Sequence, residues 1–432
     1  MKPAVDAAAT ASSSEGAGVS AGAGVSAGAG VEVVAPRRPG RLAAAWVSWR
    51  RPVLVGALGT VLLRLVTEWI GLVGRFGVDF PHRVARTPSL LTQVWSQWDV
   101  GYYLSIAQYG YAGRHAGPGQ AANDIAFAPL FPWGTRALHA VTGLGYLTSS
   151  ELLSAGALFV ALVVVYRLTA SEHGEAVAGT GITMVLAWPA AFFLLAPYPE
   201  SLALALGAGA FLALRRGRWM AAGVLGAAAT MTKYYLAVFV VAFAVAVWEA
   251  RPAGSRLADT WRRDLRRLAC AVVPTLVAFG AWMLYQAVHV GDALAFERAQ
   301  SRQWHRHFAA PWTLFATTIS HLVHWRFLDT STASVVELFD FVTVVLLAVV
   351  AVAVFLRVRR SYGVVLGLSW CVYCFESFLV GEVREVLVLF PFFVGLGMWA
   401  ARHPWRERVL LALFVPCSYF LVERFVRGAF AG

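Results

Sequence analysis

Long apolar runs separated by short, often arginine-rich connectors constrain the fold of this chain more than any other feature. Backbone N–H and C=O groups inside a bilayer must be satisfied within the protein, so apolar runs of this length fold as helices. Hydrophobic residues make up 59% of the 432 residues and charged residues only 14%, which excludes an ordinary soluble domain. The sequence therefore predicts an all-α polytopic membrane protein. We expect eleven spans, at about 52–74, 148–168, 177–196, 200–215, 219–231, 234–250, 268–289, 337–356, 362–380, 385–401 and 408–426.

The arginines predict the orientation of these helices. A group of arginines between residues 37 and 51 precedes the first run, and later basic connectors lie at 215–218, 251–267, 357–360 and 402–408. Cytoplasmic connectors of membrane proteins carry an excess of Lys and Arg, and eleven crossings place all of these segments on that side. The N-terminus is then cytoplasmic. The net charge of +12 is explained in the same way, without a nucleic-acid partner.

Composition divides the chain into a tail and a membrane domain. Residues 1–45 repeat Ala, Gly, Val and Ser without apolar periodicity and are expected to be a disordered cytoplasmic tail. Residues 46–432 form the membrane domain, with a first extracytoplasmic loop at 75–147 and a second at 290–336. The apolar segment 127–141 contains two prolines. Because counting it as a span would put every later basic connector outside, we predict an interfacial helix there.

Four ionisable side chains and one loop fall on the extracytoplasmic side of this topology: Asp99, Glu200, Lys233, Arg384 and 300–312. Polar residues that gather at one depth of a membrane protein generally mark a substrate site. The short run 219–231 also favours a hairpin over 219–250 whose tip carries Lys233 partway into the bilayer.

Each of these residues has a structural alternative. Asp99 is also suited to cap a helix or to pair with Arg75 or Arg86. Glu200, at the start of an apolar helix, interacts favourably with the helix dipole. Lys233 can snorkel to the interface, and Arg384 can pair with Glu382 or Glu385.

Aromatic and amide side chains surround these charges in the sequence. They form either an aromatic belt at headgroup level or a platform for a sugar ring and its hydroxyls. His305 and His307 have no nearby carboxylate, so no metal is predicted, and the sequence contains no glycine-rich phosphate loop and indicates no cofactor. The candidate substrate-binding residues are Trp98, Tyr102, Tyr103, Tyr198, Glu200, Gln300, Gln303, Trp304 and His305.

The segment around Asp99 resembles a known family. Trp98-Asp99, Tyr103, Ile106-Ala107 and Gly110-Tyr111 are similar to the W-D-x-x-x-Y-x-x-I-A-x-x-G-Y signature of the PIG-V group, the GPI mannosyltransferase 2 family and its bacterial relatives. Three later motifs resemble those of the family in the same order, at Phe127–Pro132, Tyr198–Ser201 and Arg384–Pro391. Lys233 lies where the family more often carries arginine, and Glu385 departs from the usual aromatic residue.

The resemblance implies a GT-C fold of about 11 transmembrane helices and a specific chemistry. Asp99 in the first outside loop would be the catalytic base, and Lys233 and Arg384 would bind the donor phosphate. The substrates would be a polyprenyl-phosphate sugar, usually mannose, and a glycolipid or glycan acceptor. The reaction would invert the anomeric centre on the outer side of a bacterial plasma membrane. The alternatives are a transporter or flippase of polyprenyl-linked lipids, a transferase with another sugar or a protein acceptor, and a non-enzymatic lipid-binding scaffold.

Overall fold

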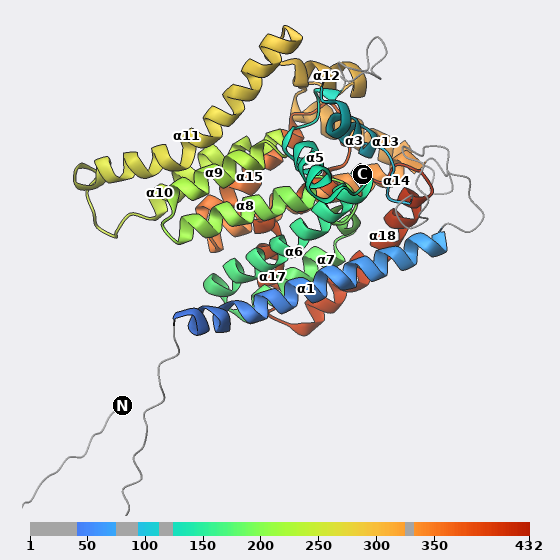
Figure 1. Ribbon diagram of the computed structural model, residues 1–432. Helices are drawn as coiled ribbons and strands as arrows, with labels where there is room; N and C mark the ends of the chain where they lie inside the picture. Colours follow the sequence, from blue (N-terminus) through green and yellow to red (C-terminus); the bar gives the residue numbers. More distant parts are fainter. Residues whose placement is uncertain (1–40, 75–93, 112–123, 325–331) are drawn as a thin grey trace, which may run out of the picture. The chain divides into compact units, whose positions relative to one another are not determined.

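The computed structural model describes residues 41–74, 94–111, 124–324 and 332–432, and these residues are helical almost throughout (Figure 1). Residues 47–432 pack as one unit, whereas of residues 1–46 only the start of the first helix is described. The elements are α1 (Arg41–Gly74), α3 (Val100–Tyr109), α5 (Leu130–Thr142), α6 (Tyr146–His173), α7 (Glu175–Ala187), η1 (Ala191–Leu194), α8 (Glu200–Arg215), α9 (Trp219–Thr230), η2 (Tyr234–Val238), α10 (Phe239–Glu249), α11 (Leu257–Val290), α12 (Ala295–Trp304), α13 (Pro311–His324), α14 (Thr332–Arg357), α15 (Arg360–Cys374), α16 (Glu382–Glu385), η3 (Val386–Val388), α17 (Phe390–Ala400) and α18 (Pro404–Val426).

Long apolar helices confirm an all-α, multi-pass membrane protein. Five helices of the described chain are long and apolar enough to cross a bilayer, at Ser48–Gly74, Tyr146–His173, Ala258–Val290, Val335–Arg357 and Pro404–Val426. A sixth candidate is the pair Glu382–Val388 and Phe390–Ala400, which is bent by 89°. The count of eleven spans stays a prediction.

Several expected spans are interrupted. The run expected at 177–196 is α7, followed by turns and the short η1. In the segment 219–250, α9 ends at Thr230 and η2 begins at Tyr234, so the helix break expected next to Lys233 is confirmed. Such irregular backbone is tolerated at membrane depth where protein or a cavity surrounds it. Breaks of this kind are therefore where a site is expected.

Glycines let two helix pairs pack closely around these breaks. A Cβ added at Gly223 of α9 would lie 2.3 Å from the carbonyl oxygen of Cys270 in α11. A Cβ added at Gly397 of α17 would likewise lie 2.9 Å from the backbone of Gly181 in α7. Small residues at helix interfaces allow this approach, which adds van der Waals contact without a hydrophobic driving force.

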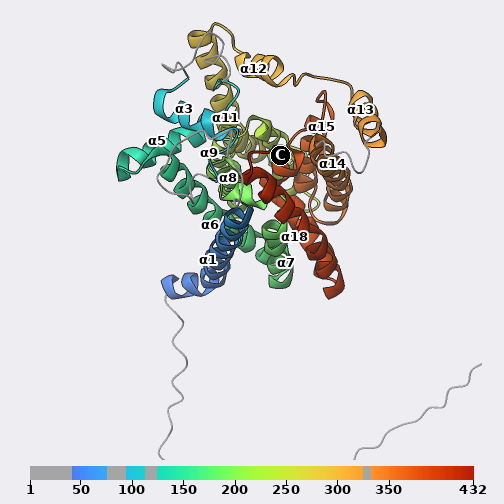
Figure 2. The same cartoon turned by 90° about the vertical axis from the view of Figure 1, so that its right-hand side faces the viewer.

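The two large loops contribute helices at one end of the molecule. In Figure 1, α3, α12 and α13 lie towards the right-hand side, which faces the viewer in Figure 2, whereas the connection between α10 and α11 lies at the far left. A helix within 127–141 is confirmed as α5, while its interfacial position stays a prediction. The expectations for residues 1–40 and for Arg75 and Arg86 lie outside the described residues.

Candidate active site

Five ionisable side chains from four separate segments meet at this end. Asp99 lies at the N-cap of α3, Glu200 is the first residue of α8, and Lys233 directly precedes η2. Arg384 and Glu385 belong to the single turn α16. The structure thus brings together the four charged residues singled out from the sequence and adds Glu385. We call these five residues the ionic cluster.

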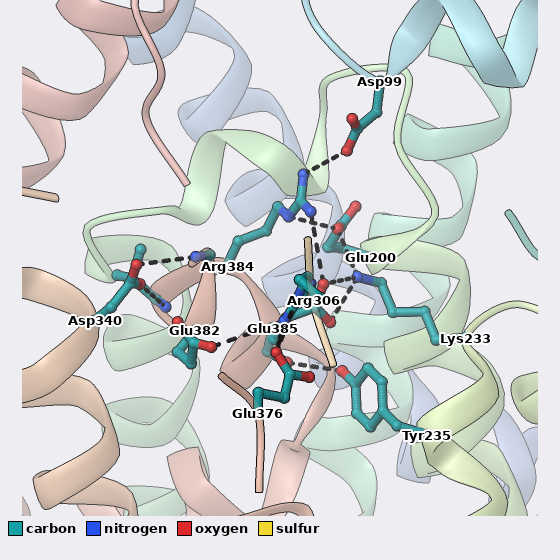
Figure 3. Close-up of polar contacts among 12 residues, drawn as sticks. Asp99, Glu200, Lys233, Tyr235, Arg306, Asp340, Glu376, Glu382, Arg384 and Glu385 are labelled. Atoms are coloured by element: carbon teal, nitrogen blue, oxygen red, sulfur yellow. Dashed lines mark hydrogen bonds and ion pairs between the residues drawn. The ribbon is translucent and has the colours of Figure 1, made fainter. Parts of the chain in front are cut away.

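The two cations of the ionic cluster lie between its three carboxylates (Figure 3). The Arg384 guanidinium donates from Nη1 to Asp99 Oδ2 at 3.1 Å, and its Nε lies 3.5 Å from Glu200 Oε1. Lys233 Nζ lies 2.9 Å from the same Glu200 oxygen and 2.6 Å from Glu385 Oε1. Arg384 Nη2 is also 3.6 Å from Glu385 Oε1. Removing one buried partner of such a pair leaves an uncompensated charge, so this geometry is strongly constrained.

Asp99 is the most accessible member of the ionic cluster. Its side chain is 23% exposed, whereas Glu200 is fully buried and Lys233 is 8% exposed. Although Asp99 occupies the N-cap position of α3, its side chain makes no capping hydrogen bond and pairs with Arg384 instead. The helix-capping hydrogen bond considered for Asp99 is therefore absent. Asp99 does form an ion pair, and its partner is Arg384.

Backbone contacts fix the turn that carries Arg384. The carboxylate of Asp340 in α14 accepts hydrogen bonds from the N–H groups of Gly381 and Val383, both at 2.9 Å. Gly381 has φ +83°, a conformation that glycine adopts without the steric cost of a Cβ. The guanidinium of Arg384 then lies over the rings of Phe193 and Tyr198, at 5.2 and 5.5 Å from their centroids.

Two predicted site residues hold a strained backbone. Trp98 and His305 both have φ +55° and are the non-glycine residues with positive φ in the described chain. For L-residues this conformation costs roughly 1–2 kcal/mol. Such residues persist where the surrounding structure fixes them and are frequent at functional sites. Trp98 directly precedes Asp99, and His305 ends α12.

A cavity of about 750 Å³ opens beside the ionic cluster. Asp99, Lys233, Arg384 and Glu385 all line it. Its remaining wall is mainly apolar and aromatic and includes three further residues predicted from the sequence, Tyr103, Gln300 and Trp304. Ligand pockets of this size commonly combine an apolar wall with a few convergent polar groups.

The aromatic residues of the first loop pack into this wall. Tyr102 stacks on Phe127 with 4.8 Å between ring centroids, and Trp304 of α12 meets both rings edge-on. Gln303 is a hydrogen-bond partner of the Tyr102 side chain. The segments around Asp99 and around Trp304, about 200 residues apart in the sequence, therefore form one surface.

Some predicted substrate-binding residues do not line the cavity: Trp98, Tyr102, Tyr198, Glu200, Gln303 and His305. Tyr198 is 1% exposed, and its hydroxyl donates to the carbonyl oxygen of Gln97 at 3.0 Å. Trp98 packs edge-on against Phe430. Since Phe430 lines the cavity, Trp98 packs behind its wall. Among the described residues no group of His, Cys, Asp or Glu side chains is arranged to hold a metal ion.

An ion pair and a backbone bridge between two loops form another part of the cavity wall. This contact was not predicted from the sequence. Arg306 Nε donates to Glu376 Oε2 at 2.7 Å, and Phe308 forms an isolated antiparallel bridge with Glu376. Burial alone would lower the pKa of Arg306, but the carboxylates of Glu376 and Glu382 outweigh it and raise the pKa, so the guanidinium stays charged. In the sequence, Arg306 is only one residue of the polar loop 300–312. No sequence pattern indicates that it pairs with Glu376.

From the sequence, Glu385 is a possible ion-pair partner of Arg384 and a departure from the family motif, but it is not predicted as a site residue. It does contact Arg384, but its shorter bond is to Lys233, which lies 152 residues away in the sequence. Its main-chain oxygen also accepts a hydrogen bond from the Tyr235 hydroxyl at 3.0 Å. The signal available in the sequence was a carboxylate next to an arginine on the predicted outer side.

Comparison with known proteins gives one local sequence match and several distant structural ones. No protein-family model matches the chain. Over 145 residues, 31% of this chain, the sequence is 33% identical to GPI alpha-1,6-mannosyltransferase 2 of Cricetulus griseus, and the match covers 28% of that protein. ArnT from Cupriavidus metallidurans, solved with undecaprenyl phosphate, superposes with a TM-score of 0.47 at 16% identity, over 83% of this chain and 63% of ArnT.

The oligosaccharyltransferase of Archaeoglobus fulgidus in its apo form superposes with a TM-score of 0.42 at 11% identity, over 86% of this chain and 56% of that protein. The chain therefore spans less than two thirds of each of these three proteins.

Proposed function

We propose that this protein is a GT-C-type membrane glycosyltransferase of the PIG-V group. It transfers mannose from a polyprenyl-phosphate donor to a glycolipid or glycan acceptor on the outer side of a bacterial plasma membrane. One observation carries the proposal: Asp99, Lys233 and Arg384 meet in the wall of one cavity. The local identity to a GPI mannosyltransferase supports the choice of sugar.

Asp99 is the catalytic base in this proposal. The acceptor hydroxyl gives its proton to the Asp99 carboxylate while its oxygen attacks C1 of the sugar. The bond from C1 to the phosphate oxygen breaks on the opposite face, so the anomeric configuration inverts and polyprenyl phosphate leaves. Arg384 holds Oδ2 of Asp99 and fixes the carboxylate relative to the cavity.

The two cations of the ionic cluster stabilise the leaving phosphate. Lys233 and Arg384 both line the cavity, and charged groups fixed in a water-poor site act on developing charge without reorganisation. Glu200 and Glu385 hold the Lys233 ammonium at 2.9 and 2.6 Å and so keep it in place before the donor binds. Tyr103, Gln300 and Trp304 contact the sugar and the acceptor.

The test is transfer from radiolabelled polyprenyl-phosphate mannose in membranes that contain the full chain. Asp99→Asn preserves the size of the side chain but cannot accept the proton, so the rate of transfer falls by at least about 100-fold while donor binding is retained. The matched control is Asp292→Asn in the second loop, whose carboxylate pairs with Arg298 at 2.8 Å outside the cavity. The control keeps transfer within about twofold of the starting protein.

Transfer by Asp99→Asn at a near-normal rate contradicts the assignment of the base. Donor binding without any product from the unsubstituted protein indicates a lipid-binding scaffold. Movement of the labelled lipid across the bilayer without a product indicates a flippase.

A further inference from the structure

The C-terminal end of α8, opposite the ionic cluster, lies next to a group of arginines. Unlike the cations of the ionic cluster, some of these arginines have no carboxylate partner among the described residues. Glu200 begins this helix in the ionic cluster, and Arg215 ends it 15 residues later, about 23 Å away. Arg216 directly follows, and Arg167 of α6 lies nearby. Both arginines contact Trp49 of α1. We call Trp49, Arg167 and Arg216 the arginine–tryptophan site.

Two guanidinium groups share one indole ring in this site. Cζ of Arg216 lies 5.1 Å from the centroid of the Trp49 ring, and Cζ of Arg167 lies 5.7 Å from it. Cation–π contact with tryptophan offsets part of the repulsion between the like charges. It also holds both guanidinium groups in fixed positions next to each other.

Neighbouring arginines are paired with carboxylates, but these two are not. Glu172 forms salt bridges with Arg215 and Arg359, and Arg51 pairs with Glu175. No carboxylate of the described residues forms a salt bridge with Arg167 or Arg216. Within the described part of the chain, the site therefore carries about two positive charges without a carboxylate partner.

A buried donor of Arg167 and the electrostatics of Arg216 favour an anion as the ligand of this site. Nε of Arg167 is buried and has no hydrogen-bond acceptor among the described residues, so the loss of its hydration is not compensated there. The pKa of Arg216 is lowered, first by burial and then by the charges of Arg167 and Arg218. An anion placed between the arginines would supply the missing acceptor and relieve the repulsion.

We propose that the arginine–tryptophan site binds the phosphate of an anionic phospholipid headgroup. Guanidinium groups bind phosphate oxygens through paired, charge-assisted hydrogen bonds. The basic connectors predict that this end is cytoplasmic, where anionic lipids attract arginines. The exposed apolar side chains of α1 begin five residues after Trp49, with Leu54 59% and Leu58 69% exposed. The site thus lies at the start of the candidate membrane span Ser48–Gly74, at the level where lipid headgroups meet the apolar part of a helix, which favours a lipid phosphate over a soluble one.

The experiment measures phosphatidylglycerol bound to the full-length protein in detergent by native mass spectrometry. Arg167→Gln combined with Arg216→Gln lowers the apparent affinity by about tenfold or more. The matched control is Arg262→Gln combined with Arg266→Gln, which removes the same charge from the N-terminal part of α11. Arg262 also lies over a tryptophan, at 5.3 Å from the ring of Trp261. The control changes the affinity by less than twofold.

Further arms of the experiment identify the ligand. Phosphatidylcholine, which has the phosphate but no net charge, binds at least about tenfold more weakly than phosphatidylglycerol. An equal loss of affinity in the control pair overturns the proposal, because it reduces the effect to overall charge. Displacement of the lipid by millimolar inorganic phosphate also overturns it and assigns the site to a soluble anion. If the double variant does not fold, Arg216→Gln alone, at an exposed position, gives a smaller loss in the same direction.

Discussion

The two ends of α8 use the same kinds of side chain with opposite balances of charge. At the Glu200 end, three carboxylates surround two cations, and every cation has at least two carboxylates within 4 Å. At the Arg215 end, Glu172 Oε1 lies 3.0 Å from Arg215 Nε and 2.8 Å from Arg359 Nε, whereas no carboxylate in the described part of the chain pairs with Arg167 or Arg216.

The difference shows how the sign of the excess charge limits what each end can bind or do. At the Glu200 end, the excess of carboxylates provides a group that can accept a proton and holds Lys233 and Arg384 in fixed positions. An excess of guanidinium groups leaves donors that an anion can satisfy. The carboxylate-rich end adjoins a cavity, whereas the arginine-rich end adjoins the apolar surface of α1.

The largest expected effect on folding comes from removing the central cation of the ionic cluster. Lys233→Met removes the nearer of the two cations that Glu200 and Glu385 share and leaves only the longer contacts with Arg384, so the free energy of unfolding falls by about 3–5 kcal/mol. Unfolding in an SDS titration measures the loss, and donor binding in the folded fraction weakens as well.

A double-variant cycle tests whether the loss comes from the ion pair. Glu385→Gln in the Lys233→Met background recovers part of the stability, because one uncompensated charge disappears. Additive losses from the two substitutions would show that Lys233 and Glu385 do not interact. The Glu200 end would then not be a cluster of coupled charges, and its contrast with the Arg215 end would no longer hold.

An intermediate effect is expected at the arginine-rich end. Glu172→Gln weakens the bonds to Arg215 and Arg359 and the 2.7 Å bond from the Tyr362 hydroxyl. The free energy of unfolding falls by about 2–3 kcal/mol, whereas transfer per folded molecule stays unchanged. Stability and transfer are measured on the same preparation. A matching loss of transfer in the folded fraction would mean that the two ends of α8 are not functionally separate.

The smallest expected effect concerns Asp124, a further carboxylate near the cavity end. Burial raises its pKa from 3.8 to about 6, although a hydrogen bond from Ser105 opposes the shift. The folded state therefore retains the proton more strongly than the unfolded state. The contribution to stability is full below pH 4, declines as the pH rises to 6, and stays low above it.

Asp124→Asn removes this pH dependence. Relative to the starting protein, the variant gains roughly 1–2 kcal/mol between pH 4 and pH 8. Thermal unfolding across that pH range measures the gain. A difference that is constant with pH would show that Asp124 ionises in the fold as it does in water.

Much of the fold follows from the sequence, since helix formation in a bilayer depends on local composition. The apolar runs predicted the long helices, and the short run before Lys233 predicted the break between α9 and η2. The same topology placed Asp99, Glu200, Lys233 and Arg384 on one side, and these four residues meet in the structure.

The sequence by itself predicted which segments are long apolar helices and that Asp99, Glu200, Lys233 and Arg384 lie on the same side, because hydropathy and the distribution of arginines act along a single segment. Only the tertiary structure decided which charges pair. Lys233 and Glu385, or Arg306 and Glu376, come from segments 152 and 70 residues apart, and their contact depends on how the helices and loops pack. The cavity beside Asp99 and the unpaired arginines around Trp49 are likewise products of packing, because each consists of side chains from several helices.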